Sequence, residues 1–249
     1  MESIIPLNSI AEALGLMDSE AGHHISLVGG GGKTTLLHAI GSQIQGKRIL
    51  TTTTKMGSDQ NNGIKTLINP NPSEILEIED QAVVIWKEIQ GPKAIGVERS
   101  ICDEWFTIVD HVIVEADGSR KRPFKAPADH EPVVPLTTTL MIVTIGSDAL
   151  GRVIADQCHR PLRVAALAGC EPYQRLDPSR AAKVLLSDRG NLKELPKGSE
   201  MKLVVTKVTE ENSHIVDVLE SCIKSISPTQ EIFAVTFDEK IGKSKNGQP

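Results

Sequence analysis

Short apolar runs alternate along the chain with segments in which apolar residues recur at helical spacing. The apolar runs are rich in Val, Ile and Leu, which is typical of strands buried on both faces of a parallel sheet. Strands are predicted at His24–Val28, Lys47–Thr52, His111–Glu115, Leu140–Ile145, Met201–Thr206 and Glu231–Val235. Helices are predicted at Ile4–Leu16, Lys33–Ile44, Ser73–Ile78, Arg99–Phe106 and Glu210–Ile223. This alternation predicts one three-layer α/β domain over residues 1–249 with a mostly parallel sheet.

Two insertions and a tail depart from this alternation. Ala82–Trp86 and Lys93–Val97 flank the turn residues Gln90-Gly91-Pro92, which predicts a β-hairpin. A helical insertion is predicted over about residues 148–190, where Asp177 followed by Pro178 is typical of a helix start. The polar segment over about residues 238–249 is predicted to be a disordered tail.

Composition narrows the class of protein. The 27 lysines and arginines are outnumbered by 32 aspartates and glutamates, so the net charge is −5. An acidic chain is a poor partner for nucleic acid or for an anionic membrane surface. No apolar run approaches the ~20 residues of a membrane-spanning helix, and the four cysteines are widely spaced, as in a reduced thiol protein. We therefore predict a cytoplasmic protein that binds neither nucleic acid nor membranes.

The clearest chemical signal is a glycine-rich turn between the first predicted strand and the helix that follows it. Glycine lets several backbone N–H groups converge on phosphate oxygens, and the positive end of the next helix adds to the attraction. A lysine at the helix start can neutralise the β- and γ-phosphates, and the hydroxyl after it can bind Mg²⁺. The candidate nucleotide-binding residues of this turn are Gly29, Gly30, Gly31, Gly32, Lys33, Thr34 and Thr35.

This turn departs from the strict pattern G-x-x-x-x-G-K-[ST], because Leu27 stands where the first glycine belongs. It resembles instead the variant K-G-G-x-G-K-T-T of one branch of the P-loop NTPases, with Val28 in place of the first lysine. A flexible turn without a ligand is the alternative, and the strand–turn–helix context favours the phosphate site. We therefore predict a P-loop NTPase-like fold that binds ATP or GTP with Mg²⁺, and we expect Lys33 to face solvent at the ligand.

Two acids end the strand His111–Glu115 and the turn after it. A P-loop enzyme needs a carboxylate at the end of a neighbouring strand to hold Mg²⁺, and Asp117 is our candidate, together with Thr34. Glu115 is predicted to orient the attacking water, so that Lys33, Glu115 and Asp117 form the predicted catalytic set. The alternative is a pair of solvated carboxylates.

The strand Lys47–Thr52 runs into more threonines and Lys55. In a parallel sheet this end faces the same crevice as the glycine turn. The hydroxyls could then bind phosphate, and Lys55 could neutralise an anion. Ordinary β-prone threonines are the alternative.

A basic, proline-rich loop follows Asp117. It contains four cations between Arg120 and Lys125, which could close over the triphosphate or over an anionic substrate, and a solvated loop is the alternative. His130 and Glu131 at its end could do acid–base work, although no second ligand stands at a spacing that would make His130 a metal ligand. Arg120, Lys125, His130 and Glu131 are counted among the candidate ligand-binding residues.

A further turn follows the strand Met201–Thr206. Its sequence Thr206-Lys207-Val208-Thr209 is similar to the [NT]-K-x-D motif with which GTPases read guanine. Thr209 replaces the aspartate that accepts the hydrogen bonds of guanine. The choice between adenine and guanine therefore stays open, and an ordinary strand-to-helix turn is the alternative.

These blocks together resemble the YqeC family, accessory proteins of selenium-dependent hydroxylases. The resemblance extends from about Ile25 to Pro161 and rests on blocks at Gly29–Thr35, Thr51–Met56, Glu115–Ser119, Lys125–Pro127, His130–Pro135, Gly146–Gly151 and His159–Pro161. It implies a nucleoside-triphosphate-binding protein that acts in the maturation of a selenium- and molybdenum-dependent hydroxylase. It also implies that Asp148, Arg160 and the pair His130-Glu131 lie near the nucleotide or a second ligand.

Three functions compete at this stage. The leading one is a Mg²⁺-dependent NTPase whose hydrolysis drives cofactor assembly or insertion into the hydroxylase. The second is a small-molecule kinase or ligase that uses ATP, with Glu115 or His130 as the base. The third is a nucleotide-gated binding module with little turnover. Phosphate release from nucleotide alone separates the first from the second.

Overall fold

The computed structural model describes residues 4–17 and 22–238. The predicted tail lies outside the described residues from position 239 onwards. Nine strands of the described chain form one sheet in the order β1-β14-β13-β11-β2-β9-β3-β6-β5, and every neighbouring pair in it is parallel. The strands are β1 (Ile5–Pro6), β2 (His23–Gly29), β3 (Arg48–Thr52), β5 (Thr66–Ile68), β6 (Ala82–Trp86), β9 (His111–Glu115), β11 (Leu140–Gly146), β13 (Glu200–Thr206) and β14 (Ile232–Thr236).

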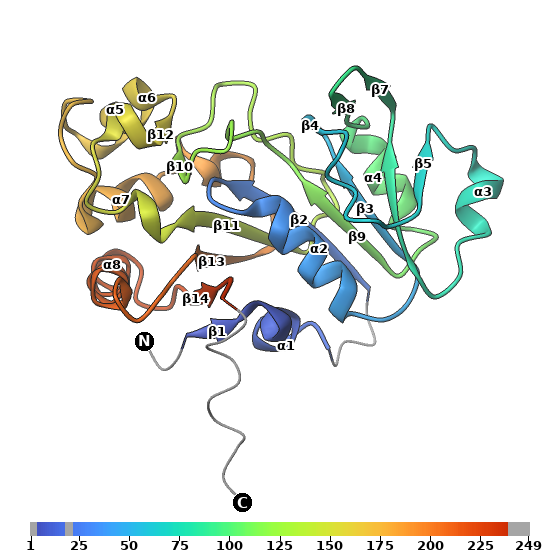
Figure 1. Cartoon of the computed structure of the whole chain (residues 1–249), viewed down its shortest axis with the longest axis horizontal. Coiled ribbons are helices and arrows are strands. Elements are labelled where there is room, and N and C mark those ends of the chain that lie inside the picture. The colour runs from blue at the N-terminus through green and yellow to red at the C-terminus, as the bar shows by residue number, and fades with distance from the viewer. Residues whose placement is uncertain (1–3, 18–21, 239–249) are drawn as a thin grey trace, which may run out of the picture.

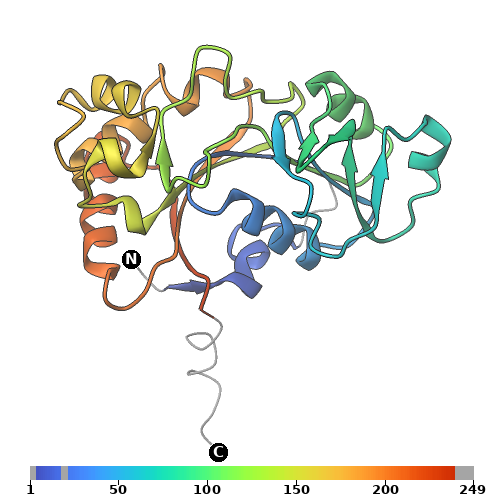
Figure 2. The ribbon, with the colours of Figure 1, turned by 45° about the horizontal axis from the view of Figure 1, so that its top comes forward.

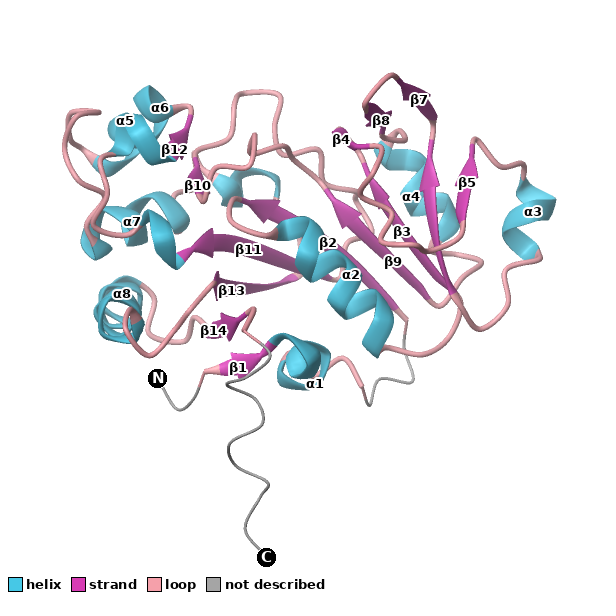
Figure 3. Ribbon diagram, in the orientation of Figure 1, coloured by secondary structure: helices cyan, strands magenta, loops and turns pink. Residues whose placement is uncertain are grey.

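Helices cover both faces of this sheet (Figures 1 and 3). They are α1 (Ile10–Ala13), α2 (Lys33–Gln43), α3 (Pro72–Leu76), α4 (Arg99–Trp105), α5 (Ile154–Gln157), α6 (Pro161–Ala168), α7 (Pro178–Leu185) and α8 (Ser213–Ile226). Neighbouring residues Leu27 and Val28 of β2 belong to different apolar clusters, because successive strand residues point to opposite faces. The cluster with Leu27 contains α1 and α2, and the cluster with Val28 contains residues of α4, α6, α7 and α8. The prediction of an α/β fold with a mostly parallel sheet is therefore confirmed, and the helices on both faces fit the predicted three layers.

The segment predicted as one helix over Ile4–Leu16 is more divided than we expected. Ile5 and Pro6 form β1, which pairs with Val235 and Thr236 at the edge of the sheet, and only Ile10–Ala13 is α-helical. Proline has no N–H to donate and is tolerated on an edge strand. The two ends of the described chain thus lie side by side (Figure 2).

The predicted hairpin has the right turn but the wrong first strand. Ala82–Trp86 is β6, which pairs in parallel with β3 and β5 inside the large sheet. The antiparallel partner of β8 (Lys93–Ile95) is instead β7 (Glu88–Gln90), and β4 (Lys55–Gly57) completes this small sheet of three strands. Four of the five residues of β6 are buried, so the apolar run is used for the core rather than for an exposed hairpin.

The predicted helical insertion contains α5, α6 and α7. The Asp177 side chain accepts a hydrogen bond from the Arg180 N–H and Pro178 is the first helical residue, so the predicted start of α7 is confirmed. Between α5 and α6, β12 (Cys158–His159) pairs with β10 (Phe124–Lys125). This short parallel pair attaches the insertion to the loop that follows β9. Among the described residues, no helix combines the length and apolar composition needed to cross a bilayer.

A histidine is buried inside β2. His24 is 0% exposed, its Nδ1 lies 2.8 Å from the Thr137 hydroxyl, and its ring centroid lies 5.1 Å from that of Phe106. Burial lowers the pKa of His24 to about 4, although the charge of Asp103 acts in the opposite direction. The ring is therefore neutral in the folded protein at neutral pH.

This burial makes stability depend on pH. The unfolded chain takes up a proton on His24 below about pH 6.5 and the folded chain only near pH 4, so the free energy of unfolding falls as the pH is lowered between these values, by about 3 kcal/mol for this group. The variant His24→Asn should lose this part of the pH dependence in urea unfolding. Exposed His214→Asn serves as the control and should retain it; an identical pH profile for wild type and His24→Asn would contradict the assignment.

Candidate functional site

The candidate site lies where β2 and β9 end side by side and α2 begins. Leu27 of β2 is in register with Glu115 of β9, and Thr144 of β11 with Gly29. Because all strands of the large sheet are parallel, their carboxyl ends share one edge, and α2 starts at that edge directly after the turn Gly29–Gly32 (Figure 1). Ligands of open parallel sheets bind at this edge.

The glycine turn is held on both sides by backbone. A Cβ on Gly31 would lie 2.2 Å from the Gly146 backbone nitrogen, and Gly31 has a φ of +83°, which side-chain-bearing residues rarely adopt. A Cβ on Gly30 would lie 2.7 Å from the Arg122 carbonyl oxygen. The Thr206 hydroxyl donates a hydrogen bond to the Gly31 carbonyl oxygen. The turn is therefore fixed by the end of β11, by the basic loop and by the first residue of the Thr206–Thr209 block.

Lys33, the first residue of α2, does not face solvent, and our expectation on this point was wrong. It is 3% exposed, and its Nζ donates a hydrogen bond of 2.7 Å to the Gly29 carbonyl oxygen. The same amine lies 3.2 Å from Asp117 Oδ1 and 3.7 Å from Glu115 Oε1. Burial alone would lower the pKa of Lys33, but the two carboxylates raise it above its ordinary value, so the amine is charged.

Thr34 contacts Glu115 rather than Asp117. The Thr34 hydroxyl donates a hydrogen bond of 2.6 Å to Glu115 Oε2, and Glu115 is 8% exposed. Two hard oxygens of the kind that Mg²⁺ prefers are thus adjacent at the helix start. Asp117, the predicted partner of Thr34 in metal binding, forms its polar contacts with Gly29, Lys33 and Lys125 instead of with Thr34. The metal-binding role of Asp117 stays a prediction.

Asp117 is instead enclosed between two lysines. It is 0% exposed, its Oδ2 accepts a hydrogen bond of 3.1 Å from the Gly29 N–H, and the same oxygen lies 3.0 Å from Lys125 Nζ. Lys33 approaches the other oxygen. Asp117 therefore joins the glycine turn, the start of α2 and the basic loop through a single carboxylate.

The ion pairs continue through the basic loop to the helical insertion. Lys125 Nζ lies 2.8 Å from Glu131 Oε2, and Arg160 Nη2 lies 3.1 Å from Glu131 Oε1. Burial raises the pKa of Glu131, but the hydrogen bond and charge of Lys125 and the charge of Arg160 bring it below its usual value. Among the predicted site residues, Lys33, Thr34, Glu115, Asp117, Lys125 and Glu131 thus form one network. Arg160, which the family resemblance implied to lie near a ligand, joins this network through Glu131.

Other predicted residues lie outside this network. Thr35, Lys55, Arg120 and His130 are exposed, and Lys55 is the first residue of β4 in the small sheet. The threonine hydroxyls that end β3 bind backbone: Thr51 donates to Ile85, Thr52 to Glu115 and Thr53 to Val133, each at the carbonyl oxygen. The structure therefore gives these three hydroxyls a structural role.

The Thr206–Thr209 block lies at the site through Thr206 and through an ion pair of Lys207. Lys207 Nζ lies 2.8 Å from Asp148 Oδ2, and the Ser147 hydroxyl donates a hydrogen bond of 2.7 Å to the Lys207 carbonyl oxygen. Lys207 has a φ of +57°. Asp148, which the family resemblance implied to be near a ligand, is thus next to the glycine turn through Gly146 and Thr206.

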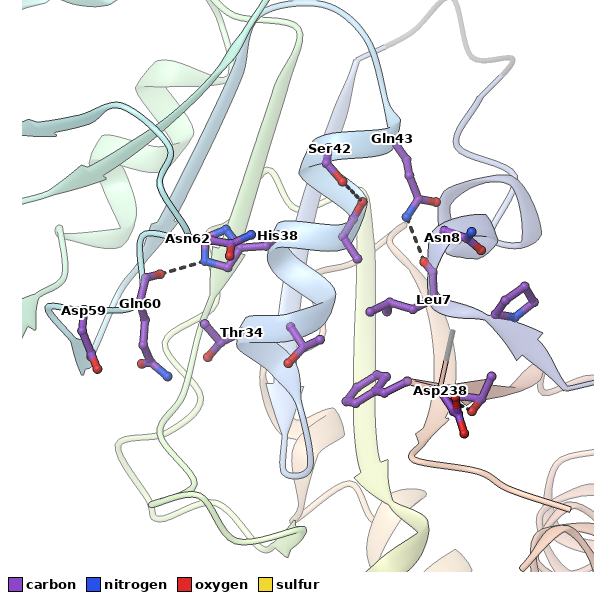
Figure 4. A pocket seen from close by; sticks show the side chains of 15 residues that line it. Leu7, Asn8, Thr34, His38, Ser42, Gln43, Asp59, Gln60, Asn62 and Asp238 are labelled. Atoms are coloured by element: carbon purple, nitrogen blue, oxygen red, sulfur yellow. Dashed lines mark hydrogen bonds between the residues drawn. The ribbon is translucent and has the colours of Figure 1, made fainter. Parts of the chain in front are cut away.

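A pocket of about 720 Å³ lies beside α2 and adjoins the start of that helix (Figure 4). Thr34 and Thr35 line it together with Phe237, which follows β14, and with residues of the loop after β4. His38 Nε2 lies 2.8 Å from the Gln60 carbonyl oxygen, and burial lowers the pKa of His38, so its ring is neutral at neutral pH. Sequence reasoning missed this pocket because nothing in a single sequence indicates that Phe237 packs against Gly32.

Fold and site together define a parallel α/β protein with a glycine turn, a buried lysine at the start of the next helix, and two acids at the end of the neighbouring strand and in the turn after it. The family model of the YqeC protein matches residues 25–162, and the chain belongs to this YqeC family. It is 30% identical over 214 residues to a protein of Escherichia coli (strain K12) described as "Uncharacterized protein YqeC". This match covers 80% of each of the two chains. No solved structure matches the chain.

The enclosed carboxylate should dominate the stability of the site. Asp117→Asn keeps an acceptor for the Gly29 N–H but leaves two buried lysines facing a neutral group, and we expect the free energy of unfolding to fall by about 3 kcal/mol or more. Asp148→Asn removes an exposed partner of Lys207 and should cost no more than about 1 kcal/mol. Urea unfolding followed by tryptophan fluorescence measures the free energy of unfolding of both variants. Equal losses in the two variants would show that Asp117 contributes no more to stability than an exposed ion-pair partner.

Proposed function

We propose that the protein is a Mg²⁺-dependent nucleoside triphosphate-binding protein that hydrolyses its nucleotide. The observation that carries the proposal is the convergence of Lys33, Thr34 and Glu115 on the glycine turn at the carboxyl edge of the sheet. The N–H groups of the turn and of the first turn of α2 supply donors for phosphate oxygens, and the positive end of α2 favours an anion there. Lys33 adds a charged amine.

Lys33 can leave Asp117 for a phosphate without stranding a buried charge. The Lys125 amine remains 3.0 Å from Asp117 Oδ2 and the Gly29 N–H remains bonded to the same oxygen. The carboxylate therefore keeps a counter-ion when a triphosphate takes over the Lys33 amine. A site with Lys33 as the sole partner of Asp117 would oppose nucleotide binding by the cost of an unpaired buried ion.

The oxygens at the helix start fit Mg²⁺. No group of three or more His, Cys, Asp and Glu side chains within the described part of the chain could hold a metal ion. Mg²⁺ characteristically binds one or two protein oxygens and completes its shell with phosphates and water, which is what Thr34 and Glu115 offer, 2.6 Å apart. When bound, Mg²⁺ neutralises charge on the phosphates. We assign the binding of Mg²⁺ to Thr34 and Glu115. We assign to Asp117 the positioning of Lys33.

The pocket beside α2 is the proposed place of the nucleoside. It begins at Thr34 and Thr35, where the phosphates would end, and offers the Phe237 ring and the amide nitrogen of Gln60. These groups can stack on and donate to either adenine or guanine, so the proposal covers ATP and GTP.

Family membership suggests the client. We propose that turnover serves the maturation of a selenium- and molybdenum-dependent hydroxylase or the insertion of its cofactor, as the family resemblance implies. The four cysteines are free, in keeping with a cytoplasmic protein that works under reducing conditions.

A kinase or ligase is the second candidate, because a cationic pocket lies next to the site. Arg120, Arg122 and Arg160 line it, and it could hold a phosphoryl acceptor in place of water. Phosphate release in the presence of nucleotide alone supports the hydrolase, and turnover only after an acceptor is added supports the kinase or ligase.

The first prediction of the proposal concerns the lysine. Lys33→Ala should weaken ATP and GTP binding about 100-fold or more, because the variant loses the buried cation that faces the phosphates. Titration calorimetry with Mg²⁺ measures this, and circular dichroism establishes that the variant is folded. Lys183→Ala removes an exposed lysine of α7, away from the glycine turn, and should bind normally. Full affinity in folded Lys33→Ala would remove the phosphate role.

The second prediction separates Glu115 from Asp117. Glu115→Gln should raise the Mg²⁺ concentration needed for half-maximal turnover about tenfold, since it removes one charged oxygen beside Thr34. Thr34→Ser retains the hydroxyl and is the conservative control, whereas Thr34→Ala should resemble Glu115→Gln. An unchanged Mg²⁺ requirement in Glu115→Gln would return the metal role to Asp117.

A further inference from the structure

A second pocket, of about 500 Å³, lies where the basic loop meets the helical insertion. Its polar lining consists of Arg120, Arg122, His159 and Arg160, and Cys158 lies on its wall. None of the lining residues is acidic. Arg160 pairs with Glu131 outside the lining, whereas Arg120 and Arg122 have no carboxylate partner among the described residues. Cations gathered in this way repel one another, and an anion relieves that repulsion.

The fold brings the two parts of this pocket together through a short parallel ladder. Phe124 of β10 is in register with Cys158 of β12, and Lys125 with His159. The ladder sets the arginines that precede β10 against the one that follows β12. The pocket is therefore built from segments more than thirty residues apart, which the sequence pattern alone would not connect.

The three arginines differ in how many of their guanidinium donors are already hydrogen-bonded within the protein. Arg122 donates to the Asp156 carbonyl oxygen, and Arg160 divides its donors between Glu131 and His159. Arg120 has no hydrogen-bond or ion-pair partner within residues 4–17 and 22–238. The pocket thus has a guanidinium whose donors are all available to a ligand.

Two further features favour an anion. α6 begins at Pro161 on the wall of the pocket and no side chain caps it, so the partial positive charge of its N-terminus is present there. Burial together with the charges of Arg160, Lys125 and Arg120 lowers the pKa of His159 to about 4. A neutral ring thus sits among cations that disfavour a further proton.

We propose that this pocket binds a phosphate-type dianion, either the terminal group of a phosphorylated small molecule or free phosphate. The planar guanidinium binds phosphate through paired N–H donors, which a dianion of this size can accept from two arginines at once. The role of this ligand as the second substrate or the released product of triphosphate turnover rests on the proposed function. The binding of the ligand by the arginines does not depend on that function.

The pocket is joined to the nucleotide site by Glu131. This carboxylate accepts from Arg160 through Oε1 and from Lys125 through Oε2, and Lys125 in turn neutralises Asp117. An anion that draws Arg160 away leaves Glu131 to Lys125 alone. The occupancy of the pocket therefore alters the charge balance around Asp117.

The experiment uses inorganic phosphate and ribose 5-phosphate as probes in a chloride buffer without nucleotide. Calorimetry gives the affinity, and the His159 ring signals in NMR report where the probe binds. The double variant Arg120→Gln and Arg160→Gln should bind the better probe about tenfold or more weakly. Arg152→Gln, an exposed arginine of the same insertion outside the pocket, should stay within about twofold of wild type. Preference for ribose 5-phosphate indicates a phosphorylated small molecule, and preference for phosphate indicates the free ion.

Several results would overturn the proposal. They are unchanged affinity in the double variant, an equal loss in Arg152→Gln, and an unshifted His159 signal at saturating probe. Because Arg160 contacts Glu131, Arg120→Gln alone is the second variant. It removes no hydrogen bond or ion pair formed among residues 4–17 and 22–238, and it should weaken binding about threefold or more. In Lys33→Ala the probe should still bind. Loss of probe binding there would place the anion at the glycine turn, whereas failure of nucleotide binding in the wild type would overturn the proposed function and leave the pocket to be judged by its arginine variants.

Discussion

Asp117 carries a negative charge where solvent does not reach, and the surrounding structure is arranged to neutralise it. Its oxygens meet the amines of Lys33 and Lys125 and the N–H of Gly29, so one carboxylate connects β2, α2 and the basic loop. A buried ion is tolerated only with good geometry and more than one partner. The arrangement also allows the lysine at the helix start to change partner while the aspartate keeps another, which a two-residue pair would not permit.

The parallel sheet supplies the placement on which this charge balance depends. The carboxyl ends of β2, β9, β11 and β13 lie at one edge, so that Gly29, Glu115, Gly146 and Thr206 come together although they are far apart in the sequence. The two apolar faces, one closed by α1 and α2 and the other by α4 and α6 to α8, keep this edge in place. The charged residues of the site thus lie on strand ends and short turns of a framework whose core is mainly apolar.

The sequence predicts the part of this arrangement that has a period or a local signature. The strands around Leu27, Ile113 and Val143 follow from continuous apolar runs, and the glycine turn followed by Lys33 marks the site. Spacing could not show that Lys33 is buried, because its burial depends on Asp117 and on Glu115 in another strand. Nor could it show that Thr34 meets Glu115, that Ala82–Trp86 enters the large sheet, or that Arg160 joins the network, since each depends on pairing between distant segments.

The hydrogen bond from Thr206 to the Gly31 carbonyl oxygen has a consequence for how the protein folds during its synthesis. The two residues are 175 positions apart, and Phe237, which packs against Gly32, lies further still. As the chain is synthesised from its N-terminus, the glycine-rich segment emerges early, and its contacts with Thr206 and Phe237 can form only after β13 and β14 have been made. A chain that stops before Thr206 and Phe237 therefore lacks two of the contacts that hold the glycine turn in its folded shape.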